Sequence, residues 1–260
     1  MEASFKRTLV LVALALVFVA TAAPQALAHT RVRAHASSAP PAIAAGNLPG
    51  CLLGTLSDPR PLLRSFRATI LRVVVSPPFG GQGQALPCIS TARSEGYRVE
   101  LVIQWTSTWT LTHTKQFFTQ MLRSYGRYLW AVGVGNEQEI TPRLSSAGYA
   151  RAWRAVVPIV KRFSPHAVRV GGEISPWGMS FLRGAVRDGL PGIQALAVHT
   201  YRYAWAPKIS QVLALAQKYR LPVWADEGLY DGPKSWHPSR DLPLSAMRGV
   251  AVAGVWDSGY

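Results

Sequence analysis

Two glutamates stand where short apolar runs of the sequence end. Glu137 follows the run that begins at Leu129, and Glu227 follows the run that begins at Leu221. Apolar runs of this length are typical of buried strands, so we expect each carboxylate at the rim of a sheet. A pair of rim carboxylates is what acid/base chemistry on a glycosidic bond requires. The pair therefore indicates an enzyme.

Other predicted strand ends carry side chains that suit a sugar. Aromatic rings stack on the apolar faces of pyranoses, while amides and carboxylates bond to hydroxyl groups. Of the further carboxylates nearby, we expect Glu139 and Glu173 to be accessory or solvent-facing. The remaining residues at or just past these ends are Ser76, Trp105, Asn136, His199, Tyr201 and Trp256.

Strand alternation predicts which of these side chains share a face. On one strand His199 and Tyr201 lie two positions apart, so the imidazole and the phenol should project together. On another, Val223, Ala225 and Glu227 share a face by the same rule. Asp226 then points to the opposite side, toward the helices, and is the weaker candidate for a nucleophile.

Apolar runs and amphipathic stretches alternate along the chain. We expect strands at 51–56, 70–75, 99–105, 130–135, 168–174, 193–198, 222–225 and 252–255. Helices are expected at 59–69, 90–97, 114–129, 146–163, 178–188 and 207–219, with a short one at 245–250. This alternation predicts an α/β fold, a small (β/α)8 barrel with its active residues at the carboxyl ends of the strands. The chain stops four residues after Trp256, so the final covering helix is expected to be missing.

The first part of the chain has the pattern of a targeting segment. Residues 1–28 contain Lys6 and Arg7, an apolar stretch, and a small-residue cleavage site at Ala26 to Ala28, which together predict a signal peptide. An uncleaved membrane anchor is the alternative. Residues 29–47 are expected to be a flexible linker and residues 48–260 the barrel. The mature protein is therefore expected to be secreted or extracytoplasmic, without a stable membrane span, and a monomer.

Composition limits the remaining possibilities. Cys51 and Cys88 are the sole cysteines, and export makes a disulfide between them plausible, with two buried thiols as the alternative. No histidine and cysteine spacing predicts a metal site, and no cofactor is expected. The chain has 28 Lys+Arg against 13 Asp+Glu. This charge permits binding to acidic polymers, but solvated helix faces also explain it, and no nucleic-acid motif is found.

The motifs resemble those of the retaining β-glycosidases of clan A, in particular families 5 and 39. The matching pieces are Asn136-Glu137, His199-Thr200-Tyr201, the run Trp224 to Gly228, and Val255-Trp256, with Arg72 similar to the arginine of the family 5 pattern. The resemblance covers about residues 50 to 260. It departs from family 5 at Gln138, where a proline is common, and at Gln104-Trp105, where a histidine would stand.

The resemblance implies a role for each matching residue. Glu137 would be the general acid/base and Glu227 the nucleophile, with Asn136 on the sugar 2-hydroxyl. Tyr201 and Arg72 would support the nucleophile, His199 would orient the acid/base or the sugar, and Trp256 would form the floor of the subsite. Trp105 is a further candidate for substrate contact. The expected function is a secreted retaining β-glycoside hydrolase acting on a poly- or oligosaccharide, and the alternative is a non-catalytic carbohydrate-binding barrel.

Overall fold

The computed structural model describes residues 42–46, 51, 58–76, 87–106, 108–140, 143–200, 205–227 and 250–256. All of them belong to one compact unit, Arg33–Tyr260. The predicted signal peptide, most of the predicted linker, Tyr201 and most of the expected short helix at 245–250 lie outside these residues. No helix in the described ranges is both long and apolar enough to cross a bilayer.

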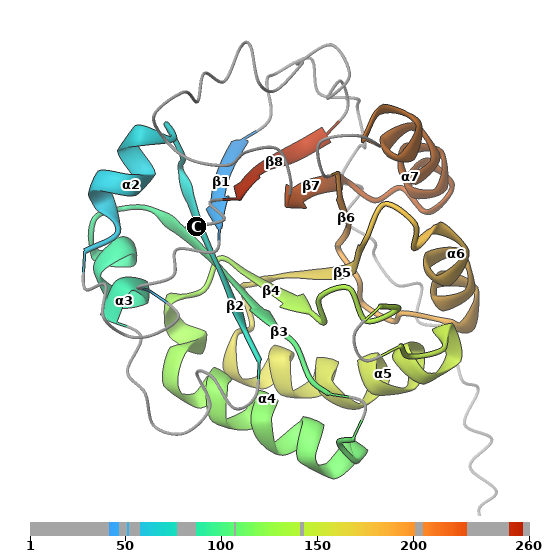
Figure 1. Cartoon of the computed structure of the whole chain (residues 1–260). Coiled ribbons are helices and arrows are strands. Elements are labelled where there is room, and N and C mark those ends of the chain that lie inside the picture. The colour runs from blue at the N-terminus through green and yellow to red at the C-terminus, as the bar shows by residue number, and fades with distance from the viewer. Residues whose placement is uncertain are drawn as a thin grey trace, which may run out of the picture. The chain divides into compact units, whose positions relative to one another are not determined.

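Eight parallel strands close into a barrel in sequence order, and the described helices lie around the outside (Figure 1). The predicted (β/α)8 fold is therefore confirmed. The strands are β1 Ala42–Gly46, β2 Ile70–Val75, β3 Arg98–Ile103, β4 Ala131–Val134, β5 Val168–Ile174, β6 Ala195–His199, β7 Val223–Glu227 and β8 Val250–Trp256. The helices are α2 Arg60–Ser65, α3 Pro87–Ser94, α4 Leu111–Tyr125, α5 Ser146–Phe163, α6 Met179–Asp188 and α7 Trp205–Tyr219, with a 3-10 turn η1 at Gly126–Tyr128.

Helices form where apolar periodicity coincides with a capping residue. Helix α4 begins after Thr110, whose side chain accepts the His113 N–H, and α5 begins after Ser145, whose side chain accepts the Gly148 N–H. Each cap satisfies a backbone donor that the first helical turn leaves free. Helix α5 buries Tyr149 and other apolar residues on one face, which packs against the barrel.

The first strand differs from the prediction. We expected it at 51–56, but β1 is Ala42–Gly46, inside the stretch that we assigned to the linker. It pairs with β8 over five positions, from Ala42 opposite Val252 to Gly46 opposite Trp256, and so closes the barrel. Small residues without periodicity give no strand signal of their own, because the pairing comes from neighbours that are distant in sequence. The barrel therefore starts before residue 48.

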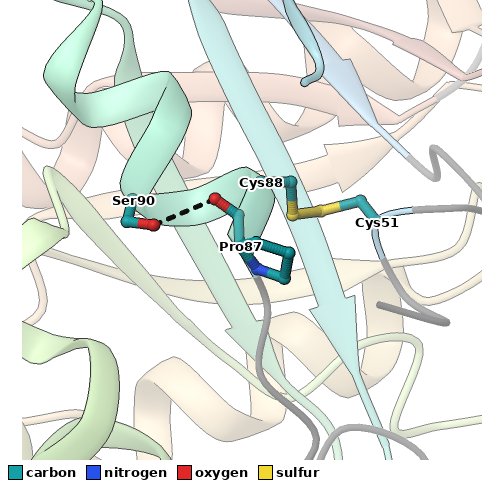
Figure 2. The surroundings of a disulfide bond; sticks show 4 residues. All are labelled: Cys51, Pro87, Cys88 and Ser90. Carbon is teal, nitrogen blue, oxygen red and sulfur yellow. Dashed lines mark hydrogen bonds between the residues drawn. A yellow bond between two sulfur atoms is a disulfide. The ribbon is translucent and has the colours of Figure 1, made fainter. Parts of the chain in front are cut away.

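The predicted disulfide is present. Cys51 and Cys88 are bonded, with their Cα atoms 5.7 Å apart (Figure 2). The bond joins the segment after β1 to the first turn of α3. The bond ties the start of the barrel to a helix that covers it.

Two layers of apolar side chains fill the fold. The outer layer lies between strands and helices and includes Val223 and Ala225 of β7. The inner layer lies within the barrel and includes Ala197 and Trp224. The stacked indoles of Trp130 and Trp224, with ring centroids 5.0 Å apart, form part of this inner layer. Polar side chains replace apolar ones in the barrel nearer the carboxyl ends of the strands, where the candidate site lies.

Candidate active site

Glu137 directly contacts His199. The Nδ1 atom of His199 lies 2.9 Å from Oε1 of Glu137, although the two residues are 62 positions apart in the sequence. The His199 side chain is fully buried, whereas 19% of the Glu137 side chain is exposed. The carboxyl is thus held on one side by a rigid buried partner and reaches solvent on the other, as a group that acts on a bound substrate must.

The second glutamate lies beside the same histidine. Glu227 is the last residue of β7, and its Cα pairs with that of His199 on β6. His199 is therefore next to both glutamates. Its side chain contacts Glu137, and its backbone is paired with that of Glu227 in the ladder between β6 and β7. The structure thus brings the ends of β4, β6 and β7 together at one rim.

The alternation by which we preferred Glu227 to Asp226 assumed that Val223 and Ala225 face the barrel interior, and this assumption is wrong. Val223 and Ala225 belong to the helix-facing layer and Trp224 to the barrel interior, so strict alternation would group Glu227 with the helix-facing residues. The ladder, however, is irregular. Ala197 pairs with Trp224 and His199 with Glu227, so β7 contains one residue more than β6 in this interval. Strict alternation therefore does not hold between Trp224 and Glu227.

A second irregularity, in the ladder between β5 and β6, changes the direction in which the Glu173 side chain points. Between Gly171 and Ile174, β5 also has one residue more than β6. Gly172 and Glu173 both adopt positive φ, 96° and 41°, and the Glu173 side chain is fully buried in the barrel. The expectation that Glu173 is accessory or solvent-facing is therefore half wrong, because its carboxylate does not face solvent.

Arg72 connects this buried carboxylate to the rim. Its Nη2 atom donates to Glu173 Oε2 at 2.8 Å and to Asn136 Oδ1 at 3.0 Å. Its Nε atom lies 3.9 Å from Oε2 of Glu100, a further buried carboxylate that sequence reasoning missed. The signal for Glu100 was present, since it interrupts an otherwise apolar strand. A buried arginine between two carboxylates stays charged and holds its partners in place.

Two glutamines converge on the backbone next to Glu137. Gln104 Nε2 donates to the Asn136 carbonyl oxygen at 3.1 Å, and Gln138 Nε2 donates to the same oxygen at 3.3 Å. These are the two positions at which the sequence departs from the family 5 pattern. The peptide before Glu137 is therefore fixed from both sides, and this matters because Glu137 has a strained positive φ of 44°.

Glu139 joins the loops after β4 and β5. The Ser175 N–H donates to Glu139 Oε1 at 2.6 Å, while Glu137 N–H donates to the Glu173 carbonyl at 2.8 Å. Burial raises the pKa of Glu139 above its ordinary value, and the nearby Glu137 carboxylate raises it further. This partly buried carboxyl therefore links the two loops, and its expected accessory role stays a prediction.

The aromatic candidates divide into two cases. Trp105 is only 4% exposed and packs against Phe118 and Tyr149, in the layer between barrel and helices. Its described ring contacts are therefore with aromatic side chains of this layer. Trp256 ends β8 opposite Gly46, so its backbone lies at the rim. Among the described residues, no group of three metal-ligating side chains is suitably arranged for an ion.

Comparison with known proteins supports the fold. No family profile matches the sequence, and no curated protein matches it. Among solved structures, an exo-β-1,4-mannosidase from Opitutaceae bacterium strain TAV5 is similar over 84% of this chain, with 14% identity and a TM-score of 0.59. This chain spans about half of that protein, 52% of its length.

Two further structures cover more of their own length. A GH26 β-mannanase from Bacteroides ovatus matches 86% of this chain and 82% of its own, with 10% identity and a TM-score of 0.59. Cel5A from Thermotoga maritima, solved with mannotriose, matches 83% of this chain and 89% of its own, with 10% identity and a TM-score of 0.60. The resemblance of this barrel to glycoside hydrolases is therefore found in three dimensions, at the level of the fold.

Proposed function

We propose that the protein is a retaining β-glycoside hydrolase that cleaves O-glycosidic bonds of a poly- or oligosaccharide. Glu137 is its general acid/base and Glu227 its nucleophile. The observation that carries the proposal is the position of His199, bonded to Glu137 at 2.9 Å and paired in register with Glu227. The fold neighbours, named as mannosidase, mannanase and glucosidase, support the same class.

The reaction proceeds in two displacements. The Glu227 carboxylate attacks the anomeric carbon while Glu137 gives its proton to the departing glycosidic oxygen, leaving a glycosyl ester on Glu227. Glu137, now ionised, takes a proton from water, and the oxygen of that water displaces Glu227 from the sugar. Esterification removes the negative charge of Glu227 in the first displacement, and hydrolysis of the ester restores it in the second. The configuration at the anomeric carbon is retained.

The neighbouring side chains support this chemistry. Arg72 occupies Oδ1 of Asn136, so the amide N–H2 group of Asn136 remains as the donor for a sugar hydroxyl oxygen. We assign the 2-hydroxyl to it, and the floor of the subsite to Trp256. Tyr201 supports Glu227, and Arg72 adds positive charge beneath the site. His199 orients Glu137. We do not assign Trp105 to substrate contact.

The proposed setting is extracytoplasmic. The disulfide fits an oxidising compartment, as does a signal peptide at residues 1–28. The proposed enzyme acts without a cofactor as a monomer.

The test is hydrolysis of aryl β-glycosides and of β-mannan, β-glucan and xylan by wild type, Glu137→Ala and Glu227→Ala. Azide should restore turnover of activated aryl glycosides to both variants. Glu227→Ala should release the α-glycosyl azide and Glu137→Ala the β-glycosyl azide, because azide replaces the nucleophile in one and attacks the glycosyl-enzyme in the other.

Asp226→Ala is the matched control, since it removes the adjacent carboxylate. It should retain most activity and yield no glycosyl azide. An α-glycosyl azide from Asp226→Ala instead of Glu227→Ala would reverse the assignment of the nucleophile. If wild type binds glycans and hydrolyses none, the protein is a carbohydrate-binding barrel and the proposal fails.

A further inference from the structure

The final turns of the helices carry cations at the end of the barrel remote from the site. In a βα barrel the helices end where the next strands begin, opposite the carboxyl ends of the strands. Helix α6 ends in Arg187, which is paired with Asp188 at 3.7 Å. The other described helices have exposed basic residues in their last turns: Arg64, Arg93, Arg123, Lys161, Arg162 and Lys218.

More cations occupy the turns and strand starts at the same end. They are Arg67, Arg98, Arg127, Arg169 and Arg220, all exposed except the half-buried Arg169. Arg67 and Arg220 have φ values of 51° and 55°, in the left-handed region that glycine or asparagine adopts more easily. We call these five residues and the six helix-end cations together the cationic base.

The helix dipole does not account for the cationic base. A helix dipole favours cations in the last turn and equally favours acidic residues in the first turn. No described helix from α2 to α7 has an acidic residue in its first turn. Arg98 and Arg169, moreover, lie at the starts of β3 and β5 and not at helix ends. The positive charge is therefore concentrated at one end of the barrel, and compensation of the helix dipoles does not explain it.

The cationic base is not neutralised by carboxylates in the described part of the chain. Two carboxylates lie at these helix ends, Glu95 and Asp188, and they pair with Arg60 and Arg187. None of the cations of the base makes an ion pair with a described residue. Neighbouring helices lie about 8–10 Å apart, close to the Debye length of about 8 Å at physiological salt, so the fields of adjacent cations add.

Aromatic rings hold several of these cations in place. Arg98 lies over Trp130 at 4.9 Å from the ring centroid, and Arg123 and Arg162 both lie over Phe163, at 5.6 and 5.2 Å. Arg127 over Tyr128 and Lys218 over Tyr219 repeat the arrangement. A cation that already lies over a ring loses less side-chain freedom when it binds an anion.

We propose that the cationic base binds an acidic polysaccharide through its carboxylate or sulfate groups. Arginine forks match such groups with two parallel hydrogen bonds. Cations cover Trp130, Phe163, Tyr128 and Tyr219 at this end, which leaves fewer ring faces for stacking nucleobases. Of the exposed large hydrophobic residues described, only Tyr219 lies here, which is too little to enter a membrane. The choice of a polysaccharide rests on the proposed function.

The two ends of the barrel then have separate tasks. The rim contains Glu227, whose ionised carboxylate in the proposed mechanism disfavours an acidic chain in the active site. The cationic base attracts the same chain from the opposite end. An acidic glycan thus retains the enzyme near a neutral substrate without competing for the site.

The test measures binding of polygalacturonate, with dextran as the uncharged control, by calorimetry at about 20 mM and 300 mM salt. All proteins carry Glu137→Gln, so that hydrolysis does not interfere and a failure of the proposed activity does not affect the result. One variant replaces Arg123, Arg127 and Arg162 with glutamine. The matched control makes the same change at Lys115, Arg151 and Arg183, exposed cations elsewhere on the helices.

We expect polygalacturonate, and not dextran, to bind the parent protein at low salt, with at least tenfold weaker binding at 300 mM salt. The base variant should lose about tenfold in affinity and the control variant less than twofold, because three anion contacts are removed from one only. Equal losses in both variants, or no binding at low salt, would overturn the proposal. Tighter binding to duplex DNA or to phosphatidylglycerol vesicles than to polygalacturonate would show that the polysaccharide is the wrong class.

Discussion

Gly133 of β4 faces Glu173 of β5 so closely that a β-carbon on Gly133 would overlap Oε1 of that carboxylate. The barrel interior thus accommodates the Glu173 carboxylate because the neighbouring strand lacks a side chain. The carboxylate in turn holds Arg72, which holds Asn136 beside Glu137. A missing methyl group in one strand therefore supports the geometry of the rim.

The variant Gly133→Ala should displace Glu173 and weaken its bond to Arg72. We expect unfolding free energy to fall by about 1–3 kcal/mol and activity to fall with it. Urea unfolding measures the first effect. Gly46→Ala is the matched control, because its β-carbon would lie 3.6 Å from the nearest atom, an ordinary contact with Arg72. Equal stability of the two variants would show that the space at Gly133 is unimportant.

The glutamines at 104 and 138 should act together on Glu137. Each donates to the Asn136 carbonyl, so each change to alanine should lower kcat about fivefold, the equivalent of about 1 kcal/mol, and leave KM nearly unchanged. The double variant should depart from additivity, since both bonds restrain one peptide. A double-mutant cycle in kcat measures this coupling, with exposed Gln116→Ala as the control. Strict additivity would mean that the two bonds act independently.

Glu139 should make stability depend on pH. Its pKa is raised by burial above the ordinary 4.5, so above pH 4.5 the unfolded chain loses this proton before the folded protein does. The contribution of Glu139 to stability is thus complete below pH 4.5 and is lost as pH rises through the folded value. Glu139→Gln keeps an acceptor for the Ser175 N–H and cannot ionise.

The free energy of unfolding, measured from pH 4 to 8, should therefore fall less steeply in Glu139→Gln than in wild type. The control Glu95→Gln, at an exposed carboxyl, should keep the wild-type contribution of Glu139. A Glu139→Gln profile parallel to that of wild type would contradict the prediction.

Removing the disulfide should destabilise the barrel without changing its chemistry. Cys51 and Cys88 are 37 positions apart, and the loop-closure estimate for that separation is about 4 kcal/mol. Cys51→Ala with Cys88→Ala should lower the unfolding free energy by about that amount, as should reduction of wild type. Urea unfolding under both conditions makes the comparison, and a loss below about 1 kcal/mol would be inconsistent with it.

The sequence by itself determined the elements whose patterns are strong. Strands β2 and β5 and helix α5 have the bounds that periodicity predicted, and the alternation of strands and helices led to the closed barrel. Local conformational preference and apolar spacing are enough to predict these three elements, because each segment carries enough apolar residues to define its buried face. The ends of the predicted strands at 130–135 and 193–198 then indicated Glu137 and His199, which the fold brings into contact.

Only the tertiary structure decided which faces these residues occupy. The extra residues in β5 and β7 are visible in the ladders with β6 and not in the sequence, and they determine the position of Glu173 and the pairing of Glu227 with His199. Strand β1 likewise exists through its pairing with β8, and the cationic base through the common direction of the helices. Strand register and the clustering of cations depend on segments that are distant in sequence, so no local sequence pattern predicts them.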